Sequence, residues 1–291
     1  MNTIQFVGAI ELGLIYSLVA LGVYLSFRTL NFPDLTVDGS FPLGAAVVSA
    51  SILGGVSPVM ATILAMVAGA LSGLVTAFLS TRLKMLNLLA GILTMSALYS
   101  INLRIMGRPN LALLGEQTIL TPFLKIEGGS IYFLIILVAL IIATLTWLLK
   151  THIGLALRST GSNPRMGRAV GINDHAMIHI GLALSNALVA LGGALFAQVY
   201  GFADVSMGVG TIIIGLAAVI IGEAIFHARA IVIILISCIV GAIIYRLVIA
   251  FALNSTELGL QTSDLNLVTA VIVAVAMVLP DVKRSLKRGV S

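Results

Sequence analysis

Charged side chains are scarce in this chain. Only 9% of its 291 residues are Asp, Glu, Lys or Arg, whereas soluble domains carry about 25%. Hydrophobic residues make up 59% of the chain, and the mean hydropathy is +1.15. A chain with so little polar surface is not expected to dissolve in water, which excludes the soluble protein classes.

The chain also lacks the motifs of enzymes and metal sites. Its one cysteine, Cys238, excludes a disulfide framework. No Gly-Lys dipeptide occurs, so no nucleotide-binding G-x-x-x-x-G-K-[ST] loop is present, and neither is a G-x-S-x-G or H-E-x-x-H motif. His175 and His179 are spaced i, i+4, but no third ligand accompanies them. We therefore predict that the chain is not an enzyme and holds no catalytic residue, metal or cofactor.

Long apolar runs are abundant, each close to the roughly 20 residues that cross a bilayer as a helix. Backbone groups in lipid must be paired within the segment, which favours helices. The sequence therefore predicts an all-α, polytopic membrane protein with one domain over residues 1–291. Its nine spans are expected near 4–27, 38–56, 58–80, 86–106, 130–149, 175–199, 211–226, 230–253 and 263–280.

Basic residues orient the predicted spans. With the N-terminus outside and the C-terminus inside, most Lys and Arg residues fall in cytoplasmic segments, including the final Lys-Arg-Ser-Leu-Lys-Arg run. Those left toward the outside are Arg104, Arg108, Lys125 and Arg246. The basic balance therefore indicates cytoplasmic anchoring loops and no nucleic-acid partner.

The chain contains an internal repeat. A shift of 170 residues places Val19-Ala20-Leu21-Gly22 on Val189-Ala190-Leu191-Gly192, and Phe32-x-Asp34 on Phe202-x-Asp204. The two copies, about 10–48 and 180–219, are separated by an odd number of predicted spans, so they run in opposite directions through the membrane. Inverted repeats of this kind are typical of transporters, with the pathway near the repeat interface.

A polar segment, residues 154–174, carries a short helix with both ends specified. Asn163 is a good N-cap, Pro164 suits the first helical position, and Gly171 suits the position just past the end. Arg165 and Arg168 lie on this helix. From the residues alone, a docking helix on the cytoplasmic side and an interfacial helix lying on anionic lipid are both open.

The segment resembles the cytoplasmic coupling segment of permeases of the branched-chain amino acid type ABC importers. The matches to that pattern are Gly154, Arg158, Asn163, Gly171, Ile172 and Asn173. Residues 13–46, with Asn31-Phe32, and residues 202–222 resemble the opening and the Gly-rich late spans of the same family. The resemblance implies a type II ABC importer-like fold in a bacterial cell membrane. It also implies that Arg158, Asn163, Pro164, Arg165, Arg168 and Gly171 contact a separate ATPase subunit, which holds the ATP and Mg.

The same resemblance implies the remaining partners, which are a second permease copy and a solute-binding protein on the outer face. The stretch after Phe32, Pro33–Gly39, departs from the Ala-His-Gly that is common in branched-chain permeases. It is similar to a less characterised branch associated with aromatic amino acid uptake. An amino acid is therefore the expected solute, while a sugar or nucleoside also suits this superfamily.

Polar residues inside spans are costly in lipid and tend to face a cavity or a partner helix. The candidates for the substrate pathway are Tyr16, Ser96, Tyr99, Ser100, Asn102, Ser185 and Asn186. Hydrogen bonding between helices is the competing role for each of them. Asp34, Asp38 and Asp204 are expected at the mouths of the repeat spans, where capping of a helix start is the favoured role.

Glycines add a further expectation. Gly69 and Gly73 form a G-x-x-x-G pattern that allows close helix packing. For Gly192-Gly193 and the later Gly208 and Gly210 two roles are open, which are to loosen or break helices in the second repeat and to allow close packing.

Two functional classes follow from the sequence. The first is the permease subunit of an ABC importer that forms the path for a small solute. The second is a secondary carrier or channel driven by an ion gradient, which an inverted repeat would serve equally well.

Overall fold

The computed structural model describes residues 3–123, 128–226, 230–254 and 271. Nearly all of its regular structure is helical: α1 (Thr3–Val23), the π-helix η1 (Tyr24–Thr29), α2 (Val37–Leu53), α3 (Pro58–Thr81), α4 (Asn87–Met106), α5 (Gly129–Lys150), α6 (His152–Ser162), α7 (Pro164–Ala169), α8 (Asp174–Tyr200), α9 (Thr211–Ile225) and α10 (Ile231–Asn254). Two three-residue strands, β1 (Asn110–Ala112) and β2 (Phe202–Asp204), pair antiparallel.

Six of the described helices are long and apolar enough to cross a membrane. They are α3, α4, α5, α8, α10 and the span Gln5–Thr29, which joins α1 to η1. The predicted span at 263–280 lies outside the described residues. The expected all-helical membrane fold is therefore confirmed, while the count of nine spans stays a prediction.

Two predicted spans are shorter than expected. The helices α2 and α9 have 17 and 15 residues, fewer than the roughly 20 needed for a full crossing. The segment before α2 meets Asn186, in the middle of the 27-residue α8. The first turn of α2 also contacts the loop before α9. Both helices therefore begin within the depth of the bundle, so Asp34 and Asp38 do not lie at its mouths as expected, whereas Asp204 of β2 lies at one end of the molecule.

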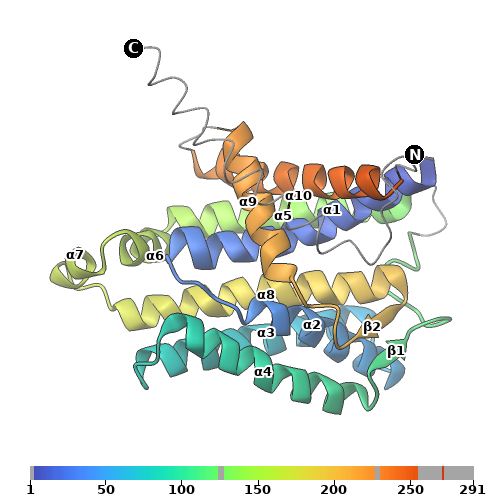
Figure 1. The fold of residues 1–291 in the computed structure, drawn as a ribbon, viewed down its shortest axis with the longest axis horizontal. Coiled ribbons are helices and arrows are strands. Elements are labelled where there is room, and N and C mark those ends of the chain that lie inside the picture. Colours follow the sequence, from blue (N-terminus) through green and yellow to red (C-terminus); the bar gives the residue numbers. More distant parts are fainter. Residues whose placement is uncertain (1–2, 124–127, 227–229, 255–270, 272–291) are drawn as a thin grey trace.

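The helices lie in layers around α8 (Figure 1). On one side α1 packs against α8, α10 and α5, and on the other α3 and α2 pack against α8, with α4 beyond them. The helix α9 crosses the others steeply (Figure 1). The segment α6–α7 projects from one end of the molecule, and the β1–β2 ribbon lies at the opposite end, where α1 begins.

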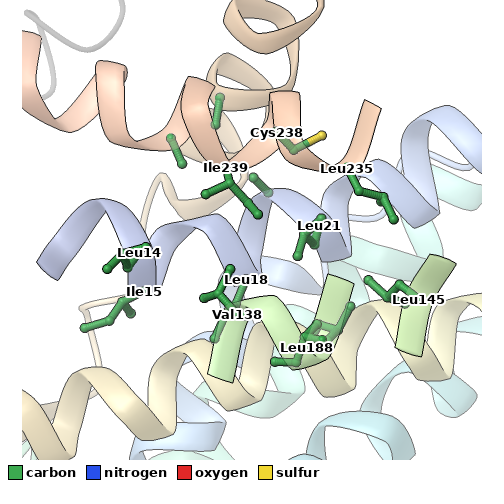
Figure 2. Packing of buried hydrophobic residues seen from close by; sticks show 14 of the residues in the cluster. Leu14, Ile15, Leu18, Leu21, Val138, Leu145, Leu188, Leu235, Cys238 and Ile239 are labelled. Carbon is green, nitrogen blue, oxygen red and sulfur yellow. The ribbon is translucent and has the colours of Figure 1, made fainter. Parts of the chain in front are cut away.

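The main apolar core joins α1, α5, α8 and α10. Figure 2 shows Leu14, Leu18 and Leu21 of α1 between Val138 and Leu188 on one side and Leu235 and Ile239 on the other. These aliphatic side chains pack against one another, as in a close-packed protein interior. This core fixes α1, with the π-helix that follows it, against the rest of the bundle.

Small residues bring α3 and α2 onto α8. A Cβ added at Gly73 would lie 2.2 Å from the carbonyl oxygen of Leu182, and one at Gly44 would lie 1.9 Å from that of Ala190. The predicted close packing at Gly69 and Gly73 is confirmed. Of the two roles open for Gly192 and Gly193, the breaking of a helix is wrong, because α8 runs through both. Gly193 instead admits the backbone of Phe41, whose carbonyl oxygen is 1.9 Å from the position of an added Cβ.

Candidate functional site

The segment that ends in α7 has the local structure expected from its sequence. Asn163 Oδ1 accepts a hydrogen bond of 3.1 Å from the Met166 N–H, so Asn163 is the N-cap. Pro164 occupies the first helical position. Gly171, just past the C-cap Val170, has φ +85°, the left-handed conformation that glycine adopts without strain. The sequence fixes both ends of this six-residue helix.

The surface of α7 is apolar as well as basic. Met166 is 66% exposed and Val170 is 73% exposed, although both are large hydrophobic side chains. Arg165 is exposed and forms no hydrogen bond or ion pair with a described residue, whereas Arg168 donates to Asp174 Oδ2 at 2.5 Å. Exposed apolar side chains beside free positive charge are typical of a surface that docks a partner.

The helix α6 links α7 to the end of the first span. A Cβ at Gly161 would lie 2.0 Å from the carbonyl oxygen of Thr29, so the backbones of α6 and η1 are in contact there. Arg28 pairs with Glu223 of α9 next to this contact. Arg158 of α6 lines a cavity of about 560 Å³ with Arg28, Tyr24, Phe27, Thr29, Asn31, Leu155, Ser159, Gly161 and Ser162. The sequence did not predict α6 as a separate helix.

A closed polar cluster holds the start of α2 against α8 and α3. Asp34, which is 0% exposed, accepts hydrogen bonds from Asn186 Nδ2 at 2.7 Å and from the Thr36 N–H at 3.0 Å. The Ser40 hydroxyl donates to Asn186 Oδ1 at 2.7 Å and lies 2.8 Å from the Ser72 hydroxyl. Each of these buried side chains has a partner, which is the condition for a stable polar cluster in an interior.

A cavity of about 370 Å³ lies between α2, α4 and the loop before α9. Its lining is Asp38, Gly39, Pro42, Met95, Ser96, Tyr99, Asn102, Val205, Ser206 and Val209. Residues 95–102 belong to the middle and second half of α4, and Ser96, Tyr99 and Val209 are exposed, so the cavity lies within the length of this span and opens on the surface of the described chain. We call it the α2–α4–α9 pocket. Its volume is within the range of about 300–1,000 Å³ that is usual for small-molecule sites.

Asp38 joins two helices that meet at this pocket. Although it belongs to the first turn of α2, its Oδ1 accepts from the Ile212 N–H at 2.7 Å and its Oδ2 from the Gly210 N–H at 3.2 Å. These groups are orphan donors at the start of α9, where a carboxylate is favoured by the helix dipole. Asp38 therefore caps α9 and not its own helix, which corrects the expected role.

The predicted pathway residues divide between these environments. Ser96, Tyr99 and Asn102 line the α2–α4–α9 pocket. Asn186 belongs to the closed cluster, and the Ser185 hydroxyl donates to the Gly22 carbonyl at 2.7 Å. Tyr16 is buried, stacks on Phe41 and carries the guanidinium of Arg246 over its ring, while Ser100 is exposed on α4 outside the pocket.

Several pocket residues were not predicted from the sequence. Capping was the favoured role for Asp38, and Ser206, Val205 and Val209 were not among the candidates. The signal that could have found them is the pair of helix starts in corresponding places of the two repeat copies, since interrupted helices point to a transport site.

The comparisons with known proteins agree with this architecture. Residues 6–279 match the family described as "Branched-chain amino acid transport system / permease component". The chain is 40% identical over 278 residues to a tyrosine transport system permease protein of Clostridioides difficile, covering 94% of this chain and 91% of the relative.

Two solved structures share the fold. The first is PsaBC from Streptococcus pneumoniae in complex with Fab, with a TM-score of 0.54, 15% identity and coverage of 94% of this chain and 89% of the other. The second is a metal-chelate type ABC transporter in an inward-facing conformation, with a TM-score of 0.52, 17% identity and coverage of 96% and 85%. With a family match over nearly its whole length and a closely similar relative, the chain belongs to the permease family of branched-chain amino acid type ABC transport systems.

Proposed function

We propose that the chain is the permease subunit of an ABC importer and that it forms the path for a small solute while a separate subunit hydrolyses ATP. The observation that carries this proposal is α7, a capped helix at one end of the bundle with exposed Met166, Val170 and Arg165. These exposed side chains call for a covering surface, and the alternatives are a lipid surface and a partner protein. A docking cleft on an ATPase would cover them.

The contacts of α6 give a route from α7 to the interior. A movement of α7 displaces α6, which touches the Thr29 backbone at Gly161. Thr29 is followed by the short segment that ends in Asp34 and α2. A push at the ATPase surface is therefore delivered to α2, one wall of the α2–α4–α9 pocket. On this basis we assign that pocket to the translocation path and the residues around α7 to coupling.

The same proposal includes an orientation of the chain in the membrane and an inverted internal repeat. The α7 end faces the cytoplasm, so α1 begins outside and the β1–β2 ribbon faces the solute-binding protein. Asp34 accepts from the N–H of Thr36, and Asp204 accepts from the N–H of Ser206, the same bond at positions 170 residues apart. These matched turns, each ahead of a helix that starts inside the bundle, support an inverted repeat. Two permease copies, nine spans each, complete the proposed assembly in the bacterial inner membrane.

An aromatic amino acid is the proposed solute class, because the most informative relative is named for tyrosine transport and the pocket has one aromatic and several apolar walls. No ATP or Mg is assigned to this chain.

The test is a charge reversal on α7. Arg165→Glu is expected to abolish ATP-driven uptake in proteoliposomes that contain the permease, its ATPase and the loaded binding protein. The unfolding temperature should stay the same, because Arg165 is exposed and makes no ion pair with a described residue. Lys84→Glu is the matched control, since Lys84 is also exposed at the same end of the bundle but lies in the α3–α4 loop.

Uptake that proceeds equally well without the ATPase subunit contradicts the proposal and favours an ion-gradient carrier. Equal loss of coupling in Lys84→Glu and Arg165→Glu would remove the special role of α7.

A further inference from the structure

The α2–α4–α9 pocket has a negatively charged residue in its lining and no positively charged one among the described residues. Among the described residues that line it, Asp38 is the only charged one, and none is Lys, Arg or His. Pro42, Met95, Val205 and Val209 form apolar walls, and the hydroxyls of Ser96, Tyr99 and Ser206 can donate or accept. The electrostatic character of the pocket is therefore set by a single carboxylate.

That carboxylate retains capacity to accept more hydrogen bonds. An ionised carboxylate has about four acceptor sites, and Asp38 uses one on each oxygen for the N–H groups of Gly210 and Ile212. Among the described residues no cation forms an ion pair with Asp38. The start of α9 contributes only about half a positive charge. A fully charged donor in the pocket would thus meet an uncompensated negative group.

Asn102 provides a second acceptor from the opposite wall. It is 0% exposed, and its Nδ2 donates to the Gly39 carbonyl oxygen at 3.2 Å. Its Oδ1 has no hydrogen-bond partner in the described part of the chain. A buried acceptor without a donor costs about 1–3 kcal/mol, so a donor supplied by a ligand would bind here favourably.

The remaining wall suits the same kind of ligand. Tyr99 lines the pocket on the same helix as Asn102, and the face of a tyrosine ring attracts an ammonium group. A ligand carboxylate, in contrast, finds no basic side chain in the lining and would lie close to the like charge of Asp38.

We propose that this pocket selects solutes by a primary ammonium group, held between Asp38 and Asn102, with an apolar or aromatic substituent against the remaining walls. The inference rests on the proposed function and refines its solute class. The amino group of the solute is the anchor in the membrane, and its carboxylate contributes nothing at this site.

Three probes test the anchor: tyramine, which lacks the carboxylate of tyrosine; 3-(4-hydroxyphenyl)propionate, which is similar in size to tyramine and lacks the amino group; and the larger guanosine, which has no ammonium. Binding to the full chain in lipid nanodiscs is measured by equilibrium dialysis, without the binding protein. Tyramine is expected to bind and to compete with L-tyrosine, and the propionate and guanosine to bind at least about 10-fold more weakly, in line with the loss of a charge-assisted hydrogen bond.

A variant locates the anchor. Asp38→Asn should weaken tyramine binding by about 10- to 100-fold, without weakening the binding of the propionate. Glu116→Gln is the matched control, because it removes a carboxylate from an exposed turn outside the pocket. Because Asp38 also caps α9, the unfolding temperature of each variant is measured as well. If Asp38→Asn does not fold, binding of the three probes to the unaltered chain still tests the inference.

The inference is overturned if the propionate or guanosine binds as tightly as tyramine, if tyramine does not bind at millimolar concentration, or if folded Asp38→Asn binds it as the unaltered chain does. The uptake assay separates this from a failure of the proposed function. If uptake depends on ATP but the probes bind against the expected order, only the ammonium anchor is refuted. If uptake does not depend on ATP, the proposed function is refuted, whatever the probes show.

Discussion

Asp34 lies just before α2 and Asp38 lies in its first turn, and the two aspartates have different surroundings. Asp34 is fully buried and bonds to Asn186 of α8, in a cluster in which each side chain has a partner. Asp38 is partly exposed to a cavity and bonds to the first amides of α9. The first carboxylate joins elements that stay together. The second joins two helices next to a cavity where a ligand can compete for it, so we expect Asp34 to matter more for stability and Asp38 more for function.

The largest difference in stability between the closed-cluster side and the pocket side of α2 should come from its backbone contact with α8. Gly44→Ala places a Cβ 1.9 Å from the Ala190 carbonyl oxygen, which cannot move without shifting α8. We expect a loss of about 3 kcal/mol in the free energy of unfolding, at the upper end of overpacking effects. On the pocket side, Gly39→Ala meets the Leu98 side chain at 2.8 Å and the Met95 Cα at 3.1 Å, so its loss should be smaller. Thermal unfolding in detergent micelles measures both.

Gly8→Ala is the control for both glycine variants. No atom lies within 4 Å of the Cβ that it adds in α1, and alanine favours a helix by up to about 1 kcal/mol. An unfolding temperature for Gly44→Ala equal to that of the unaltered chain would mean that α2 and α8 are not in the close contact described here.

The aspartates themselves give the next largest effect. Asp34→Ala removes the acceptor of two buried donors, and about 2 kcal/mol of stability should be lost. Asp38→Ala should cost only about 1 kcal/mol, as for the loss of a helix cap, because water in the pocket can reach the freed amides. Thermal unfolding checks the order, and uptake by the folded variants should show the reverse order. If Asp38→Ala is the less stable of the two, the division between a closed cluster and an exchangeable contact fails.

Much of the helical framework could be predicted from the sequence. The expected spans at 58–80 and 86–106 match α3 and α4 to within a residue at each end, because Pro58 begins one helix and Gly107, with φ +69°, ends the other. The caps of α7 were also predicted correctly, since a cap depends on residues that are neighbours in the chain. Local chemistry was sufficient for these elements.

The pocket could not be predicted in the same way. Asp38 lies next to residues 210–212 only because α2 and α9 both start inside the bundle. Hydropathy gives no sign of this, since both helices are predominantly apolar, as a full membrane span would be. The Asp34–Asn186 bond likewise depends on Gly73 and Gly44 bringing three helices together. Periodicity reports which residues are apolar, but it does not report at what depth a helix begins.

The smallest expected effect compares Asp34 with its repeat counterpart Asp204, where the same turn lies in an exposed setting. Partial burial by itself raises the pKa of Asp204. Hydrogen bonds from the Ser206 hydroxyl and N–H and from Asn110 outweigh it, and the pKa falls below its ordinary value of 3.8. A lowered pKa means that the folded state favours the carboxylate. Its contribution is therefore complete above about pH 4 and is lost as the pH falls through the lower, folded-state pKa.

Because Asp204 is only partly buried, solvent screens the effect, and we expect only a few-fold change in local opening. At pH 6, Asp204→Asn should speed hydrogen exchange of the Ser206 amide a few-fold, since an amide oxygen is a weaker acceptor than a carboxylate. At pH 3 the difference between the variant and the unaltered chain should shrink. Ser206→Ala should move this loss to higher pH, because it removes one of the bonds that lower the pKa. A difference that stays constant with pH would show that the turn is held by backbone geometry alone, unlike the Asp34 turn, which depends on its buried partners.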